Sequence, residues 1–149
     1  MQLGKYFTLE EFTISQTAIR RGIDNTPTPE VFANLEALTL NLLDPLRERL
    51  GHPIVVSSGY RSPALNQAVG GASRNGKPTS QHCFGEAADI TCPAIGQKQL
   101  FDYLRHSELP FDQLIDEFGQ WVHVSFGIKD RREVLRARRI GDDVIYTNV

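Results

Sequence analysis

Apolar residues follow a helical period before residue 50 and fall into short, β-branched runs after it, and this change of pattern restricts the fold more than any other feature. Leucines recur at helical spacing within residues 30–50, namely Leu35, Leu38, Leu42 and Leu46. Thr28 and Pro29 suit the start of this helix and Gly51 its end. Pro45 is expected to kink or interrupt it, because proline removes a backbone donor and clashes with the preceding turn.

Shorter elements surround this helix. Thr8 and Glu11 fit a capping box that opens a short helix, and the Pro, Asn and Asp content of residues 23–29 predicts a loop. Further helices are predicted at residues 62–69 and 96–106, with a polar, glycine-rich loop at residues 70–80. The predicted strands are residues 53–58, 86–92, 111–118 and 121–126, followed by a closing hairpin at residues 134–147 with Gly-Asp-Asp as its turn.

Helices therefore come first and strands cluster later, with no internal repeat and no linker between them. This order favours the α+β class over alternating βαβ units. A length of 149 residues is about that of one domain. We expect a single domain over residues 1–149, in which helices pack on a mainly antiparallel β-sheet.

Composition and charge argue against several functions. The formal net charge of −2 gives no global reason to expect a nucleic-acid partner. No run approaches the roughly 20 apolar residues that span a bilayer. Residues 1–12 also lack the basic start and apolar run of a secretory signal. These observations predict a soluble protein made in the cytoplasm, without membrane insertion, for which a monomer is a compatible state.

Two further features have open interpretations. Cys83 and Cys92 are expected to be free thiols or, as the alternative, one bridge. Residues 129–139 hold six basic residues against two acidic ones. Such a run is typically a solvated face. The alternative is that it draws the protein towards an anionic cell wall, an attraction that salt would weaken.

The stretch SQHCFGEAADI at residues 80–90 places a lone aspartate among alanines and isoleucine. A buried carboxylate is costly unless something positive holds it. A turn at Gly85 would let Asp89 face the same point as His82. In WVHVSF, the strand period of two puts His123 on the face opposite to the two valines. Two imidazoles and one carboxylate are a usual catalytic zinc set, which leaves a fourth position for water.

Three blocks of the sequence, in this order, resemble the superfamily of zinc D-alanyl-D-alanine carboxypeptidases. That group includes vancomycin-resistance D,D-peptidases, phage L-alanyl-D-glutamate endolysins and the hedgehog signalling domain. The blocks are SSGYRSPALN at residues 57–66, the pattern SxHxxGxAxDI at residues 80–90 and WVHVS at residues 121–125. The segments FTLEEF, GIDNTP and LDPLRERLG also resemble the branch found in phages and prophages. The resemblance covers about residues 6–126 and implies a hedgehog/D,D-peptidase-like zinc fold.

The resemblance further implies that one zinc ion is held by His82, Asp89 and His123. It also implies a carboxylate that accepts the proton of a zinc-activated water and passes it to the leaving amine. In several relatives this acid lies three residues before the last histidine, where this sequence has Gln120. Glu117, at the offset found in the hedgehog domain, is therefore the expected general base, with a solvated strand-end carboxylate as the alternative.

Residues around the first block are candidates for substrate binding. Arg61 matches the substrate-binding arginine of the family, and its planar guanidinium suits a carboxylate or a peptide carbonyl. The alternative is an arginine paired with an acidic loop residue. Tyr60 is expected to flank the substrate, with packing as an equal alternative. Ser80 is expected to hydrogen-bond the loop that carries the first ligand, beside the substrate.

These features predict a zinc-dependent peptidase that cleaves peptidoglycan stem peptides next to D-amino acids, at D-Ala-D-Ala, at a cross-link or at L-Ala-D-Glu. The phage-like blocks and the lack of a signal peptide suit a lytic enzyme that reaches the cell wall through a holin or on the virion. Two alternatives remain. One is a non-catalytic, zinc-containing module that binds the cell wall or another partner. The other is a cytoplasmic D,D-dipeptidase that acts on small free substrates.

Overall fold

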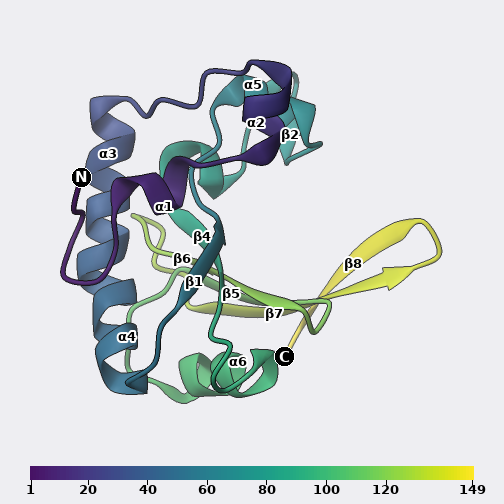
Figure 1. Cartoon of the computed structure of the whole chain (residues 1–149). Coiled ribbons are helices and arrows are strands. Elements are labelled where there is room, and N and C mark those ends of the chain that lie inside the picture. Colours follow the sequence, from purple (N-terminus) through teal and green to yellow (C-terminus); the bar gives the residue numbers. More distant parts are fainter.

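A six-stranded sheet with the strand order β1-β4-β6-β5-β7-β8 forms the centre of the structure (Figure 1). The computed structural model describes residues 1–149. All neighbouring strands run antiparallel except β5 and β7, which are parallel, so the predicted α+β class with a mainly antiparallel sheet is confirmed. The strands are β1 (Val55–Ser58), β4 (Ala87–Thr91), β5 (Gln113–Glu117), β6 (Trp121–Ser125), β7 (Glu133–Ile140) and β8 (Asp143–Asn148).

The helix predicted over residues 30–50 is a single rod made of three segments, α3 (Pro29–Leu38), η1 (Thr39–Leu43) and α4 (Asp44–Leu50) (Figure 1). The middle segment is a π-helical turn. Pro45 lies within the first two positions of α4, directly after it. The rod is continuous here, since Asp44 N–H donates to Thr39 O across the π-helical turn, and this wider turn accommodates the donor that Pro45 lacks. The expected interruption is therefore a change of helical pitch and not a break.

The remaining helices are short. Thr8 N–H donates to Glu11 Oε2, as the capping box predicts. Ser62 caps the helix that follows β1, since its hydroxyl accepts a hydrogen bond from Leu65 N. The helices are α1 (Leu9–Thr13), α2 (Gln16–Arg21), α5 (Pro63–Ala68), η2 (Gln81–Phe84) and α6 (Gln97–His106).

The two faces of the sheet have different partners, because side chains alternate along a strand. One face supplies apolar side chains to the core and packs against leucines of the rod and the apolar side of α6. From the sheet these are Ala88, Ile90, Leu114, Val122 and Val124, and from the helices Leu35, Leu38, Leu42, Leu43, Leu46, Leu100, Phe101 and Leu104. The residues between them in sequence, such as Asp89 and His123, point away from this core. The polar site therefore lies on the other face.

A loop near the N-terminus fixes the turn that follows β1. Asn25 Nδ2 donates to the carbonyl oxygens of Thr13 and Tyr60, at 2.8 and 3.0 Å. The Oδ1 atom of Asn25 accepts from Ser62 N at 2.7 Å. One asparagine thus joins α1, the turn after β1 and the start of α5. Arg61 lies in the middle of the turn that Asn25 fixes.

Three differences from the sequence-based prediction are local. The loop predicted at residues 70–80 contains a small hairpin of β2 (Ser73–Arg74) and β3 (Lys77–Pro78). Helix α2 was not predicted, although its Ser15 cap and left-handed Gly22 are ordinary helix signals. The closing hairpin turns over Gly141 and Asp142 alone, because Asp143 already pairs with Ile140.

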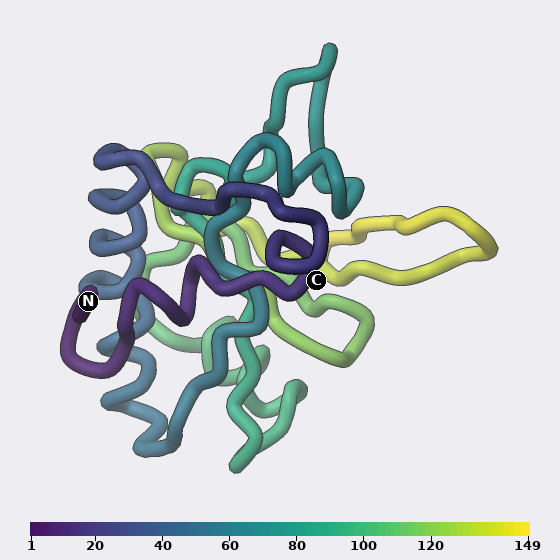
Figure 2. The backbone as a smooth tube through the Cα atoms, turned by 45° about the horizontal axis from the view of Figure 1, so that its top comes forward, coloured from purple at the N-terminus to yellow at the C-terminus, as the bar shows by residue number.

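Two segments project from the body of the molecule, as Figure 2 shows. One contains β2 and β3 (teal), and the other is the β7–β8 hairpin (yellow). No helix has both the length and the apolar content needed to cross a bilayer. Cys83 and Cys92 are both buried and free, so the first of the two predicted states is confirmed.

Candidate metal centre

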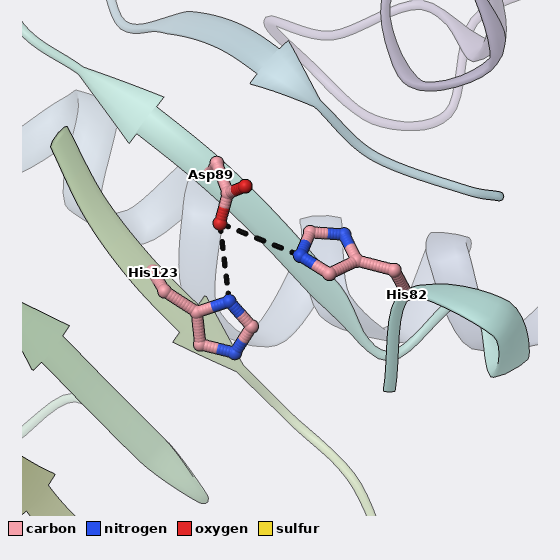
Figure 3. Close-up of side chains that lie close together, drawn as sticks. All are labelled: His82, Asp89 and His123. Atoms are coloured by element: carbon pink, nitrogen blue, oxygen red, sulfur yellow. Dashed lines mark hydrogen bonds and ion pairs between the residues drawn. The ribbon is translucent and has the colours of Figure 1, made fainter. Parts of the chain in front are cut away.

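His82, Asp89 and His123 converge on one point of the open face of the sheet (Figure 3). Asp89 and His123 are directly opposed partners on the neighbouring inner strands β4 and β6. His82 comes from η2, which ends at Gly85 in the left-handed conformation with φ 73°. That conformation favours glycine and turns the chain into β4, as the sequence predicts.

The spacing of the three side chains fits a tetrahedral metal site. Asp89 Oδ1 lies 3.4 Å from His82 Nε2 and 3.1 Å from His123 Nδ1. Zinc bound by ligand atoms at about 2.0–2.1 Å in a tetrahedron has ligand–ligand edges of roughly 3.3–3.4 Å. One ligand atom from each residue lies within 4.8 Å of the others. Two of the three ligand–ligand edges thus match a zinc tetrahedron, and two imidazoles with one carboxylate are the donor set of a three-ligand zinc site.

The orientation of His82 also fits a metal ligand. Its Nδ1 atom lies 2.7 Å from the carbonyl oxygen of Gly59, which can only accept, so Nδ1 carries the hydrogen. In the neutral ring, the lone pair of Nε2 then points at the carboxylate of Asp89. Two electron-rich atoms repel each other at this distance unless a cation, either a shared proton or a metal ion, lies between them. A backbone carbonyl that fixes the tautomer of a metal-binding histidine is the usual outer partner in such sites.

Charge in the cluster is concentrated on Asp89. Burial opposes its ionisation, but the imidazoles of His82 and His123 outweigh burial and hold the pKa of this carboxyl below its usual range. Asp89 is therefore an ionised carboxylate among apolar neighbours, and the two histidines offset the free-energy cost of burying it. A divalent cation that displaced the shared protons would be bound by one full negative charge and two imidazole nitrogens.

Glu117 lies in the same pocket as the cluster, a groove of about 870 Å³. It is 9% exposed, and its carboxylate accepts no hydrogen bond from the protein. Burial is the main cause that raises its pKa, His123 opposes the rise, and Asp89 and Asp116 add to it. On β5 the adjacent Asp116 points to the other face, where it pairs with Arg136. Of the two carboxylates, Glu117 alone is free to exchange a proton in the groove.

Arg61 borders the groove and is tied to the first ligand through Ser80. The Oγ atom of Ser80 accepts from Arg61 Nη2 at 3.1 Å and from His82 N at 3.2 Å. Arg61 Nε donates to Asn66 Oδ1 at 3.2 Å, and the backbone N–H of Arg61 donates to His82 O at 3.1 Å. No acidic residue pairs with Arg61. Its guanidinium is thus held by neutral groups and keeps its charge available to a ligand.

Two residues considered in the sequence lie elsewhere. Tyr60 is 5% exposed and belongs to the apolar core, so the packing alternative applies and the tyrosine does not flank the groove. Adjacent residues of an extended turn face opposite ways, which explains why Arg61 reaches the groove and its neighbour does not. Gln120 lies in the exposed turn between β5 and β6 and is not part of the groove wall.

A buried network beside the cluster was not predicted. Asp112 is 1% exposed and accepts hydrogen bonds from Arg131 Nε and Nη2 and from Gln81 Nε2, at 2.8, 3.0 and 2.9 Å. The Arg131 side chain is the main cause that lowers the pKa of Asp112 to about 2. Two arginines of the basic run are thus paired with aspartates. Arg131 pairs with Asp112, which directly precedes β5, and Arg136 pairs with Asp116 on β5. The run is therefore only partly a solvated face.

A comparison with protein families identifies the relatives of this chain. The sequence model of a family described as Peptidase M15 matches residues 5–125. The matched region contains the three members of the cluster as well as Arg61 and Glu117, and it ends before β7. No curated protein sequence matches the chain.

Proposed function

Since the chain belongs to the peptidase M15 family of zinc-dependent peptidases, we propose that it hydrolyses peptidoglycan stem peptides at a bond next to a D-amino acid. The observation that carries the proposal is the meeting of His82, Asp89 and His123 with the unpaired carboxylate of Glu117 in one groove. Complete ligands and a free acid beside them are what hydrolysis requires and what a pure binding module does not.

His82, Asp89 and His123 would hold the metal. Zinc in such a site supplies a water of lowered pKa and polarises a carbonyl group. In the reaction, the water oxygen bonds to the carbonyl carbon and the C–N bond breaks. Glu117 accepts the proton of the water and delivers it to the nitrogen of the leaving amine. A pKa raised by burial suits a group that must both take and give a proton near neutral pH.

Arg61 is proposed to bind the substrate. Its fork is fixed by Asn66 and Ser80, so little side-chain freedom is lost when it meets a carboxylate or a carbonyl oxygen. Ser80 would act through Arg61 and the His82 loop, because its one oxygen already accepts from both. In this proposal, Tyr60 contributes packing only.

We further propose a role as a phage or prophage lytic enzyme that acts at the cell wall. Support comes from the N-terminal blocks FTLEEF, GIDNTP and LDPLRERLG, which resemble the phage-associated branch. Expression in a Gram-negative host with and without a co-expressed holin tests this role. Lysis that needs the holin supports it, and lysis at equal rates without the holin contradicts it.

The hydrolytic proposal is tested by turbidity loss of purified Gram-negative sacculi, with zinc content measured on the same sample. We expect about one zinc per chain and clearing that a chelator and His123→Ala both abolish. Mass spectrometry of the released fragments then identifies the bond. Zinc without fragments from several wall types would favour the binding module. Cleavage of D-Ala-D-Ala dipeptide without action on sacculi would favour the dipeptidase.

A further inference from the structure

The β7–β8 hairpin lies outside the matched residues 5–125, yet it forms one side of the groove. Its first half joins the sheet through the parallel pairing of β7 with β5, and the rest projects from the body (Figure 2). Leu135, Arg139, Val144 and Tyr146 are the hairpin residues that line the groove. The hairpin is thus a wall of the groove that lies outside the region matched by the family model.

Strand register places Tyr146 and Glu117 in one row across the sheet, with only Ala137 between them. Glu117 pairs with Ala137 in the parallel ladder, and Ala137 pairs with Tyr146 in the antiparallel ladder. Directly opposed residues project from the same face of a sheet. Ala137 is buried and has only a methyl group, so the phenol ring has room to lean over it towards Glu117. The negative charges of Glu117 and Asp89 add to burial in raising the pKa of Tyr146.

Tyr146 and Arg139 are the two hydrogen-bond donors on this wall, and both are free. The hydroxyl of Tyr146 makes no hydrogen bond within the protein, and no carboxylate lies within ion-pair distance of Arg139. Arg139 is instead held over the ring of Phe118, with Cζ 5.1 Å from the ring centroid. Phe118 directly follows Glu117, so this cation is held at the end of β5 without an acidic partner.

The order of groups across the sheet indicates which side of the cleaved bond faces the hairpin. From one edge to the other, the groove presents Arg61, then the cluster on β4 and β6, then Glu117 on β5, then the hairpin. The acid that hands its proton to the leaving amine must lie on the side of that amine. The fragment released with the new amine therefore extends from Glu117 over Ala137 towards Tyr146 and Arg139.

We propose that the β7–β8 hairpin forms the subsite for the amine-side residue of the cleaved bond, and that Arg139 and Tyr146 bind a free carboxylate next to that amine. This inference rests on the proposed hydrolytic function. An unpaired guanidinium and an unpaired hydroxyl on one wall are complementary to a carboxylate. The α-carboxylate of a terminal D-Ala, of D-Glu linked through its γ-carboxyl group, or of the acceptor centre of a cross-link has this chemistry.

The test uses a stem pentapeptide that contains both L-Ala-D-Glu and D-Ala-D-Ala, with the cleaved bond identified for the wild-type protein. A second peptide has a carboxamide in place of the carboxylate next to that bond. We expect kcat/KM for the carboxylate peptide to exceed that for the amide by roughly ten- to a hundredfold, as for a charge-assisted hydrogen bond. Arg139→Gln should remove most of this preference, and Tyr146→Phe part of it.

Matched controls lie close by. Arg138 pairs with Ile145 on the opposite face of the hairpin, and Tyr103 is a partly exposed tyrosine of α6. Arg138→Gln and Tyr103→Phe should keep the wild-type preference. Calorimetric binding of both peptides to the Glu117→Ala protein measures the same preference without turnover.

The possible results separate the two proposals. Cleavage of both peptides at equal rates, unchanged in the Arg139 and Tyr146 variants, would overturn the subsite and leave the hydrolytic function intact. A preference that the Arg138 control loses as well would also overturn it, since general charge would then be the cause. If the wild-type protein cleaves neither peptide, binds neither and releases no fragments from sacculi, the function fails and the subsite with it.

Discussion

Asp89 and His123 are directly opposed on the neighbouring inner strands β4 and β6, and Asp89 Oδ1 lies 3.1 Å from His123 Nδ1. The pair is therefore positioned by backbone hydrogen bonds on both sides and not by a mobile loop. A site built on regular strands exists before its metal arrives, so binding should stabilise the folded state by mass action.

Zinc should raise the thermal midpoint of the metal-free protein. At a hundredfold excess over Kd, the gain is about 2.7 kcal/mol, which corresponds to roughly 5–10 °C for a domain of this size. Differential scanning calorimetry measures the shift. His123→Ala should lose it, whereas His106→Ala, on the exposed end of α6, should keep it. An equal shift in both variants would mean that zinc binds elsewhere.

Glu117→Gln should abolish most hydrolysis while the protein keeps its zinc. Loss of a general base lowers kcat by roughly 10²–10⁴-fold. Zinc content by mass spectrometry and hydrolysis of the stem pentapeptide are measured on the same preparation. Because Gln120 lies outside the groove, adding Gln120→Glu to this variant should not restore activity. Restoration would place the base at the position that several relatives use.

Arg61→Lys should weaken substrate use without affecting the metal. A lysine retains the charge but cannot reach Asn66, Ser80 and a ligand together, because it lacks the planar fork. We expect kcat/KM to fall by roughly ten- to a hundredfold. Steady-state kinetics and zinc content check this, with the exposed Arg49→Lys as the control. Unchanged kinetics would show that the arginine only supports the turn.

Gly59→Ala should reduce zinc affinity from a distance. A Cβ at this position would lie 2.6 Å from Phe12 O and 2.7 Å from Phe12 Cα, so the backbone must shift. The shift moves the Gly59 carbonyl oxygen that orients His82. Loss of such an outer partner lowers metal affinity roughly ten- to a hundredfold. Competition with a chromogenic chelator measures it. Gly76→Ala, in the open β2–β3 turn, controls for glycine replacement as such.

Asp112 should contribute stability that disappears in acid. Its pKa is lowered from 3.8 to about 2 in the folded protein, mainly by Arg131, so the contribution is complete above about pH 4 and is lost as the pH falls towards 2. The shift corresponds to about 2 kcal/mol at neutral pH. Urea unfolding of wild type and Asp112→Asn, at pH 7 and pH 3, should give a difference that narrows in acid. A constant difference would contradict the linkage.

Much of the fold follows from local patterns. Most elements were identified from the leucine period, the caps at Thr28 and Ser62 and the β-branched runs. Burial of one face of a helix or strand makes apolar residues recur with the period of that element. The parallel pairing of β5 with β7 joins segments that are distant in the chain, and no local period records such a contact. The β2–β3 hairpin is local, and its Asn75-Gly76 turn is a hairpin signal that was interpreted as part of a loop.

The same distinction applies to the site. The three members of the cluster could be predicted because their residue types and spacing are unusual in an apolar setting. Asp112, Arg131 and Gln81 are ordinary residues whose roles come only from meeting in the folded chain. Tyr60 and Arg61 are neighbours in one block, and only the direction of each side chain decides which of them reaches the groove.

The pairing of β4 with β6 also bears on when the metal can enter. Asp89 and His123 are 34 residues apart in the chain, so the unfolded polypeptide does not hold them together. Loading must therefore follow formation of the sheet, and a chain still emerging from the ribosome has no site for zinc. Once bound, the ion joins β4 and β6 directly. Its departure would then precede unfolding, and the lifetime of the folded protein would be set by how slowly the ion leaves.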